Sequence, residues 1–194
     1  EIYTLSLHDA LPIFGAMIDY TGHSWQDITR TIGQVTGREQ QADTVIADYD
    51  SRLTQAKGEI TVPDGTTSAL IVFGDGTGAA ALTQESPQVQ VLTSLGFAMA
   101  DIPEEVKGDT SMGPRQDIIK LSNENVQTGL PGDNWVVVAA DRASRDAIAN
   151  EPTFSTAAPV TRGRVAYTPA STFRLDYYSA LILLDSLKES YKKG

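Results

Sequence analysis

The stretch SALIVFG, residues 68–74, decides the fold class because it is an almost uninterrupted run of apolar residues that ends on a glycine. A second run of the same kind, NWVVVAA, occupies residues 134–140. Continuous apolar runs of this length are typical of strands that are covered on both faces. Segment 163–169 predicts a third strand and segment 97–100 a short fourth. These segments indicate a sheet with helices on both sides.

Helical patterns separate the predicted strands, as expected for an α/β lobe. Upstream of them, Ser24 has the side chain of an N-cap for a helix that Gly37 can end. A second helix over 38–60 spans about 28 Å from Glu39 to Lys57, at about 1.5 Å per residue. That length suits a helix that links two lobes. The remaining helices are predicted at 87–96, 122–129, 142–150 and 175–193.

The first residues, Glu1–Ile13, have another origin. They resemble the translation of a common short-read sequencing adapter, with thirteen consecutive matches. We therefore expect them to be a library artefact that takes no part in the fold. The natural protein then starts near Phe14, in mid-domain, and residues 15–20 predict a short buried strand.

The composition limits the chemistry. The formal net charge is −10, from 15 basic and 25 acidic residues, so the chain lacks the excess of basic residues that is typical of nucleic-acid-binding proteins. Cysteine is absent, and His23 is the only histidine outside the adapter segment, which argues against a metal site built on thiolates or imidazoles. An anionic ligand would need arginine or lysine side chains concentrated locally.

One motif favours an enzyme. GDGTGAA, residues 74–80, follows a strand, and Gly74, Gly76 and Ala79 satisfy a dinucleotide-binding G-x-G-x-x-A pattern, with Asp101 as a possible ribose acid. The helix that should follow at once is absent, because ALTQESP intervenes. The alternatives are a nucleotide-binding enzyme and a cleft-lining loop. No nucleophile–base pair can be assembled from the remaining residues.

Two arginines are the stronger signal. Arg115 lies in a Gly/Pro loop, and Arg174 precedes the last helix beside Phe173, Tyr177 and Tyr178. Guanidinium groups are weakly hydrated and stack on rings, so this arrangement suits a flat, aromatic, polyanionic ligand.

A plainer reading of Arg174 is an ion pair with Asp176 or a bond to a carbonyl. Arg142 and Arg145 fit solvent-facing helix charges. Spacing alone leaves these alternatives for Arg174 open.

Three segments carry a family resemblance: LTQESPQVQVLTSLGF (82–97), QDIIKLSNENVQTGL (116–130) and TFRLDYYSALILLDSLKE (172–189). In this order and spacing they resemble the C-terminal lobe of the periplasmic iron–siderophore-binding proteins of the ferric enterobactin type. Residues 24–53 resemble the end of the N-terminal lobe and the connecting helix of that family. The likeness covers about residues 15–192.

The resemblance implies a two-lobed α/β binding protein whose backbone is a long helix (class III), without catalysis. It divides the chain into an N-lobe remnant (14–37), a connecting helix (38–60) and a C-terminal α/β lobe (61–194), with most of the N-lobe missing. Its partners would be a ferric siderophore and an ABC permease. No cofactor is expected, since iron arrives bound to the siderophore. The protein would be periplasmic or a membrane-anchored extracellular lipoprotein. A cobalamin or haem binder is the nearest rival.

The same resemblance assigns roles to four residues. Arg115 and Arg174 would contact the siderophore, and Leu82 occupies a position where the family has an aromatic residue, which leaves the identity of the siderophore open. Glu124 matches an acidic residue that docks on permease arginines. A carboxylate there would also stabilise the start of a helix by a few tenths of a kcal/mol.

Overall fold

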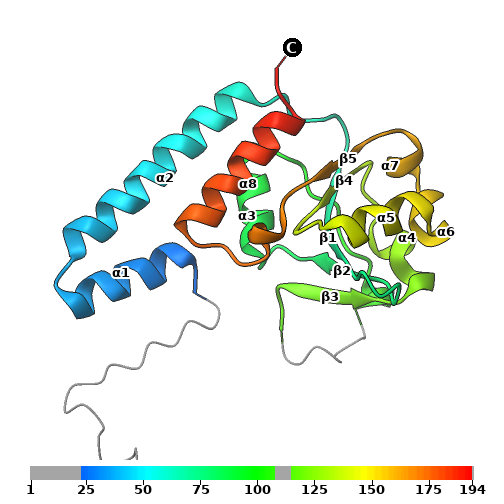
Figure 1. Ribbon diagram of the computed structural model, residues 1–194, viewed down its shortest axis with the longest axis horizontal. Coiled ribbons are helices and arrows are strands. Elements are labelled where there is room, and N and C mark those ends of the chain that lie inside the picture. The colour runs from blue at the N-terminus through cyan, green and yellow to red at the C-terminus, as the bar shows by residue number, and fades with distance from the viewer. Residues whose placement is uncertain (1–22, 108–114, 194) are drawn as a thin grey trace, which may run out of the picture. The chain divides into compact units, whose positions relative to one another are not determined.

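The structure of the chain is a computed structural model that describes residues 23–107 and 115–193 (Figure 1). Segment 1–13 and the strand predicted at 15–20 lie outside the described residues. The chain divides into two compact units between Ile46 and Ala47, within the long helix α2. Each unit is described by itself.

In the first unit, α1 (Trp25–Thr36) begins and ends where the sequence predicts. The Ser24 hydroxyl accepts a hydrogen bond from the Asp27 amide at 3.1 Å, and Gly37 ends the helix in the left-handed conformation, with φ 66°. Both features are the usual signals of a helix N-cap and stop.

Helix α2 (Glu39–Glu59) confirms the second predicted helix. In the second unit its C-terminal half is fixed to α8 (Tyr177–Ser190) by polar contacts. The Tyr177 hydroxyl donates to Asp48 Oδ2 at 2.6 Å, and Lys188 Nζ lies 3.4 Å from Glu59 Oε2. This half of the helix is therefore attached to the α/β lobe through side chains as well as through the chain.

A five-stranded mixed sheet forms the centre of the second unit, in the order β3-β2-β1-β4-β5. Strands β1, β4 and β5 are parallel, and β2 runs antiparallel to both β1 and β3. The strands are β1 (Thr67–Val72), β2 (Ala79–Leu82), β3 (Ile118–Leu121), β4 (Asn134–Val137) and β5 (Val165–Tyr167). The three strands predicted from 68–74, 134–140 and 163–169 are confirmed.

Two strands were not predicted, and one predicted strand is wrong. Strand β2 has the sequence AAAL and β3 has IIKL, each only four residues long. Alanine is depleted in strands, so β2 carries no local signal and forms because its neighbours pair with it. At 97–100 the structure has only an isolated parallel bridge between Thr67 and Met99.

Helices cover both faces of the sheet, which confirms the mixed α/β class. Helices α3 and α8 lie on one face, and α4, α5 and α6 lie on the other (Figure 1). The predicted helix at 122–129 is a 3₁₀ turn followed by the short α4. The elements are α3 (Pro87–Leu95), α4 (Val126–Gly129), α5 (Arg142–Asn150), α6 (Pro152–Ser155), α7 (Ala158–Thr161), η2 (Glu104–Val106), η3 (Asn123–Asn125) and η4 (Ala170–Thr172).

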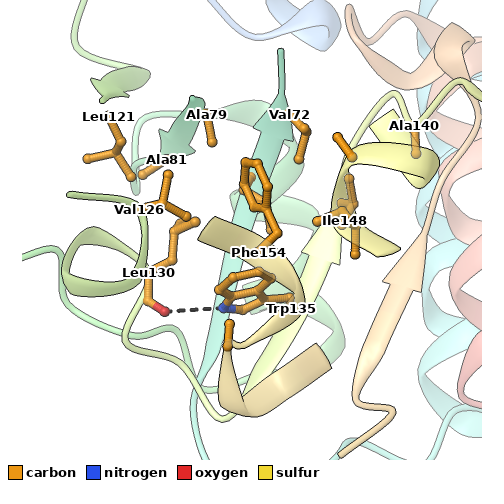
Figure 2. Packing of buried hydrophobic residues seen from close by; sticks show 14 of the residues in the cluster. Val72, Ala79, Ala81, Leu121, Val126, Leu130, Trp135, Ala140, Ile148 and Phe154 are labelled. Carbon is orange, nitrogen blue, oxygen red and sulfur yellow. Dashed lines mark hydrogen bonds between the residues drawn. The ribbon is translucent and has the colours of Figure 1, made fainter. Parts of the chain in front are cut away.

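The core under α4–α6 is built around two aromatic side chains, Trp135 and Phe154, both fully buried (Figure 2). The Trp135 indole N–H donates to the Leu130 carbonyl at 3.1 Å, so its one polar atom is satisfied. Alternate residues of β4 face opposite sides, and Val136 on the other side is buried as well. This two-sided burial is what the continuous apolar run predicts.

Candidate ligand-binding site

A cavity of about 760 Å³ opens at one end of the sheet. Its wall combines the start of β1, the last residues of β2, the start of β3 and the segment after α3. Leu82 and Arg115 both line it, so two predicted site residues that lie 33 positions apart in sequence meet at one cavity. The other lining residues include Thr83, Gln84, Glu85, Asp101, Ile102, Glu104, Lys107, Gln116 and Ile119.

Arg115 is held through its side chain. Its Nε donates to Asp117 Oδ1 at 2.9 Å and its Nη2 to Asp117 Oδ2 at 2.6 Å, a bidentate pair that leaves the Nη1 edge of the guanidinium for other acceptors. These bonds raise the pKa of Arg115 and lower the pKa of the Asp117 carboxyl. The pair keeps the guanidinium in one orientation but offsets its charge.

The lining of the cavity is not basic overall. Lys107 is paired with Glu104, as Arg115 is with Asp117. Glu85 and Asp101 add two further carboxylates to the wall. A polyanion at this end of the sheet would therefore need a cation beyond the two that line the cavity.

Arg174 lies outside the cavity lining, on the segment that leads into α8. It is exposed, and no ion pair to it occurs among residues 23–107 and 115–193. The pairing with Asp176 that the sequence left open is not formed. Asp176 instead caps α8, where its Oδ1 accepts from the Ser179 amide at 2.8 Å.

Glu124 lies at the opposite end of β3 from Arg115. It is an exposed residue of η3, and a hydrogen bond with the Ser122 side chain lowers the pKa of its carboxyl. The carboxylate is therefore charged at neutral pH and accessible to a basic partner. The structure separates this residue from the cavity by the length of one strand.

The GDGTGAA motif is the turn of a hairpin. The Phe73 amide donates to the Gly78 carbonyl at 3.1 Å, and Ala79 is the first residue of β2. A dinucleotide fingerprint needs a helix to start at this loop and point its N-terminus at the pyrophosphate. Here α3 starts only at Pro87, so the nucleotide-binding alternative is wrong in its structural premise.

The described parts of the chain, 23–107 and 115–193, contain no cluster of three His, Asp or Glu side chains that could hold a metal ion. Within the same ranges, no helix is long and apolar enough to cross a membrane.

Sequence reasoning missed two residues of this region. Asp117 had a local signal, because it carries the opposite charge only two residues after Arg115, and the two side chains form a bidentate pair. Gln88 had none. It is buried at the start of α3, and the two carbonyls to which its Nε2 group donates lie more than 80 positions away.

The fold and the site define a class: a mixed α/β lobe carrying a long helix, with a cavity and an arginine at one end of its sheet. The chain belongs to the periplasmic binding protein family, whose model matches residues 7–172. It is 37% identical over 186 residues to the ferric enterobactin-binding periplasmic protein FepB of Escherichia coli O6:H1 (strain CFT073), an alignment that covers 95% of this chain and 58% of FepB. The chain thus spans somewhat over half the length of this relative.

Solved structures agree on the fold. Holo-ViuP superposes with a TM-score of 0.78 at 20% identity, covering 90% of this chain and 58% of that one. The triscatecholate siderophore binding protein FeuA from Bacillus subtilis, complexed with ferri-bacillibactin, gives a TM-score of 0.66 at 18% identity and covers 90% and 61% of the two chains. At these identities the likeness concerns the architecture.

Proposed function

We propose that this chain is the C-terminal lobe and connecting helix of a substrate-binding protein that captures a ferric siderophore and delivers it to an ABC permease. The observation that carries the proposal is the 37% identity to a ferric enterobactin-binding protein along 95% of the chain. The family is one of binding proteins, and the proposed role involves no catalysis and no resident cofactor. The boundaries expected from the sequence, with the connecting helix at 38–60, are part of this proposal.

The chemistry of the site supports a catecholate ligand. A ferric tris-catecholate has three negative charges and flat rings, and arginine can both donate to its oxygens and lie against its rings. Arg115 lines the cavity with one edge of its guanidinium free of Asp117, and Arg174 is exposed and unpaired among the described residues. Leu82 supplies an aliphatic wall, where its family has an aromatic one.

Glu124 is proposed as the contact with the permease, because it is exposed, charged and distant from the cavity. The proposed location is the periplasm, or the outer surface of a membrane as an anchored lipoprotein. In both locations the lobe would meet the permease from the outside of that membrane.

The proposal is tested by equilibrium ultrafiltration with ligands that absorb visible or ultraviolet light. The chain is mixed in turn with ferric enterobactin, cyanocobalamin, haemin and NAD, and the absorbance retained with the protein is measured. We expect saturable retention of ferric enterobactin and none of NAD. If cobalamin or haemin is retained and the ferric siderophore is not, the protein is a cobalamin or haem binder. Retention of NAD alone would refute the transport role.

A further inference from the structure

Residues 83–88, which run from the end of β2 into the first turn of α3, contact both arginine-bearing parts of the chain. We call them the bridging segment. At its start, the Thr83 amide donates to the Asp117 carbonyl at 3.0 Å, and the Thr83 hydroxyl donates to the Gln116 carbonyl at 2.6 Å. The Ser86 amide then donates to the Thr83 carbonyl at 3.0 Å. The bridging segment is therefore fixed to the residues that immediately follow Arg115.

Its other end is the buried side chain of Gln88, which is 5% exposed. The Gln88 Nε2 group donates to the carbonyls of Thr172 at 2.9 Å and Phe173 at 2.7 Å. Its Oε1 accepts from the Ser86 hydroxyl at 2.7 Å, and Ser86 is 1% exposed. A buried amide whose donors and acceptor are all used favours one arrangement of its partners, because any other leaves polar groups unpaired.

The two carbonyls that Gln88 binds are those directly before Arg174. On the other side, the Ser179 hydroxyl donates to the Arg174 carbonyl at 2.9 Å. Thr172 is held further by its hydroxyl, which lies 2.7 Å from the Thr168 hydroxyl and 3.3 Å from the Ala139 amide. The backbone at Arg174 is thus fixed from both directions, while its side chain stays exposed.

These contacts form one continuous path from Arg115 to Arg174, which are 59 positions apart in the sequence. It runs from Asp117 and Gln116 through Thr83 and Ser86 to Gln88. We propose that Gln88 is a positioning residue for ligand recognition, which holds the Arg174 backbone against the bridging segment so that both guanidinium groups serve one ligand. This inference rests on the proposed function. It assigns to Gln88 no contact with the ligand.

A double-mutant cycle separates positioning from general stabilisation of the fold. Gln88→Met keeps an unbranched side chain of similar length and removes all three hydrogen bonds. We expect it to weaken binding of ferric enterobactin by about three- to tenfold. Gln90→Met, at an exposed position of the same helix, is the matched control and should change the affinity less than about twofold.

The decisive measurement is whether the effect of Gln88→Met on affinity depends on which of the two arginines is present. In a chain that already carries Arg174→Ala, Gln88→Met should have almost no further effect on affinity. In a chain that carries Arg115→Ala, it should keep its full effect. Equal losses in both backgrounds would overturn the proposal, because Gln88 would then not act through Arg174.

A milder variant covers the case in which Gln88→Met does not fold. Ser86→Ala removes the hydroxyl that holds Gln88 Oε1 and leaves both Gln88 donors in place. Its smaller loss of affinity should also vanish with Arg174→Ala, and a loss that persists there overturns the proposal. If the unaltered chain does not bind ferric enterobactin, the proposed function fails and this inference with it. If it binds and the cycle is additive, only the inference fails.

Discussion

The two ends of the short β2–β3 ladder are built in different ways. At one end, which we call the open end, Leu82 is the last residue of β2 and lines the cavity together with Arg115. At the other end Ala79 pairs with Leu121, and the hairpin and the exposed Glu124 lie beyond this pair. The same pair of strands therefore carries a candidate ligand site at its open end and a candidate partner contact at its closed end.

The contacts at the two ends differ in kind. The open end depends on side chains: the hydroxyl of Thr83 and the carboxylate of Asp117 fix the chain there. At the closed end the main chain itself is closely packed, because Gly78 lies directly against the Leu121 carbonyl; one side chain, Asn123, also donates through Nδ2 to the Gly76 carbonyl at 2.9 Å. Changes to the glycine backbone at the closed end should therefore act on stability, and changes to the arginine at the open end should act on binding.

The largest effect is expected from Gly78→Ala. Gly78 has φ 129°, and a Cβ there would lie 2.1 Å from the Leu121 carbonyl oxygen, so the hairpin or the ladder must shift. We expect a loss of more than about 2 kcal/mol in the free energy of unfolding, measured by urea denaturation. Gly37→Ala is the control, since Gly37 has φ 66° but open space around the added methyl group. It should cost about 1–2 kcal/mol, for conformation alone. Equal costs would mean that the close approach to Leu121 is unimportant.

At the open end, Arg115→Ala should weaken binding of ferric siderophore by about tenfold or more, that is about 1.4 kcal/mol. The variant loses a cation and also leaves the Asp117 carboxylate unpaired beside the cavity. A charge pair at about 4 Å and an effective dielectric near 20 is worth roughly 4 kcal/mol before desolvation, so both changes matter. The added change Asp117→Asn should therefore restore part of the affinity.

Arg174→Ala should also weaken binding of ferric siderophore about tenfold. Unlike Arg115→Ala, it leaves no carboxylate of the described residues without its ion-pair partner, so no second substitution is needed. Arg142→Ala is the control for both arginines, because Arg142 is an exposed residue of α5 that lies 3.7 Å from Asp146. It should leave affinity unchanged in isothermal titration. If Arg142→Ala weakens binding as much as the other two, net charge alone explains the losses.

The elements that could be predicted are those with a strong local pattern. The apolar run of β1 and the capped, periodic helices α1 and α2 all follow from nearby residues. Strand β2 does not, because three alanines favour no strand on their own. Since β2 separates β1 from β3, missing it also hid the antiparallel half of the sheet and the hairpin at Gly74–Ala79.

The candidate site could likewise be predicted only in part. Arg115 and Arg174 stand out in the sequence, one in a Gly/Pro loop and the other beside aromatic residues, and the family resemblance implies a role for both. Their connection through Gln88 could not be predicted. The Gln88 side chain binds the main-chain carbonyls of Thr172 and Phe173, which lie 84 and 85 positions further along the chain. Hydrogen bonds to carbonyls leave no pattern in the sequence of the accepting segment.

Glu124→Ala should separate transport from binding. Glu124 lies at the closed end of the ladder and is exposed, so its removal should leave the affinity for ferric siderophore within about twofold. Uptake by cells that carry the full-length protein should fall several-fold, since a rim charge mainly affects association with a partner. Glu189→Ala, an exposed acidic residue of α8, should change neither quantity. A parallel loss of affinity and uptake in Glu124→Ala would show that the two ends of the ladder are not independent.

The smallest effect is the contribution of the Arg115–Asp117 pair to stability. Hydrogen bonds from Arg115 lower the pKa of the Asp117 carboxyl in the folded state. The pair therefore stabilises the fold above the unfolded pKa of about 3.9, and this contribution is lost as the pH falls through the lowered folded value. The two side chains are 43% and 32% exposed, so we expect no more than about 1 kcal/mol.

The measurement compares the unfolding free energies of the unaltered chain and Asp117→Asn between about pH 7 and pH 2.5. The unaltered chain should be the more stable of the two at neutral pH, and the difference should vanish at the acidic limit. A difference that persists there would show that the Asp117 side chain acts through packing and not through its charge. In that case the open end would depend on close packing, as the closed end does at Gly78.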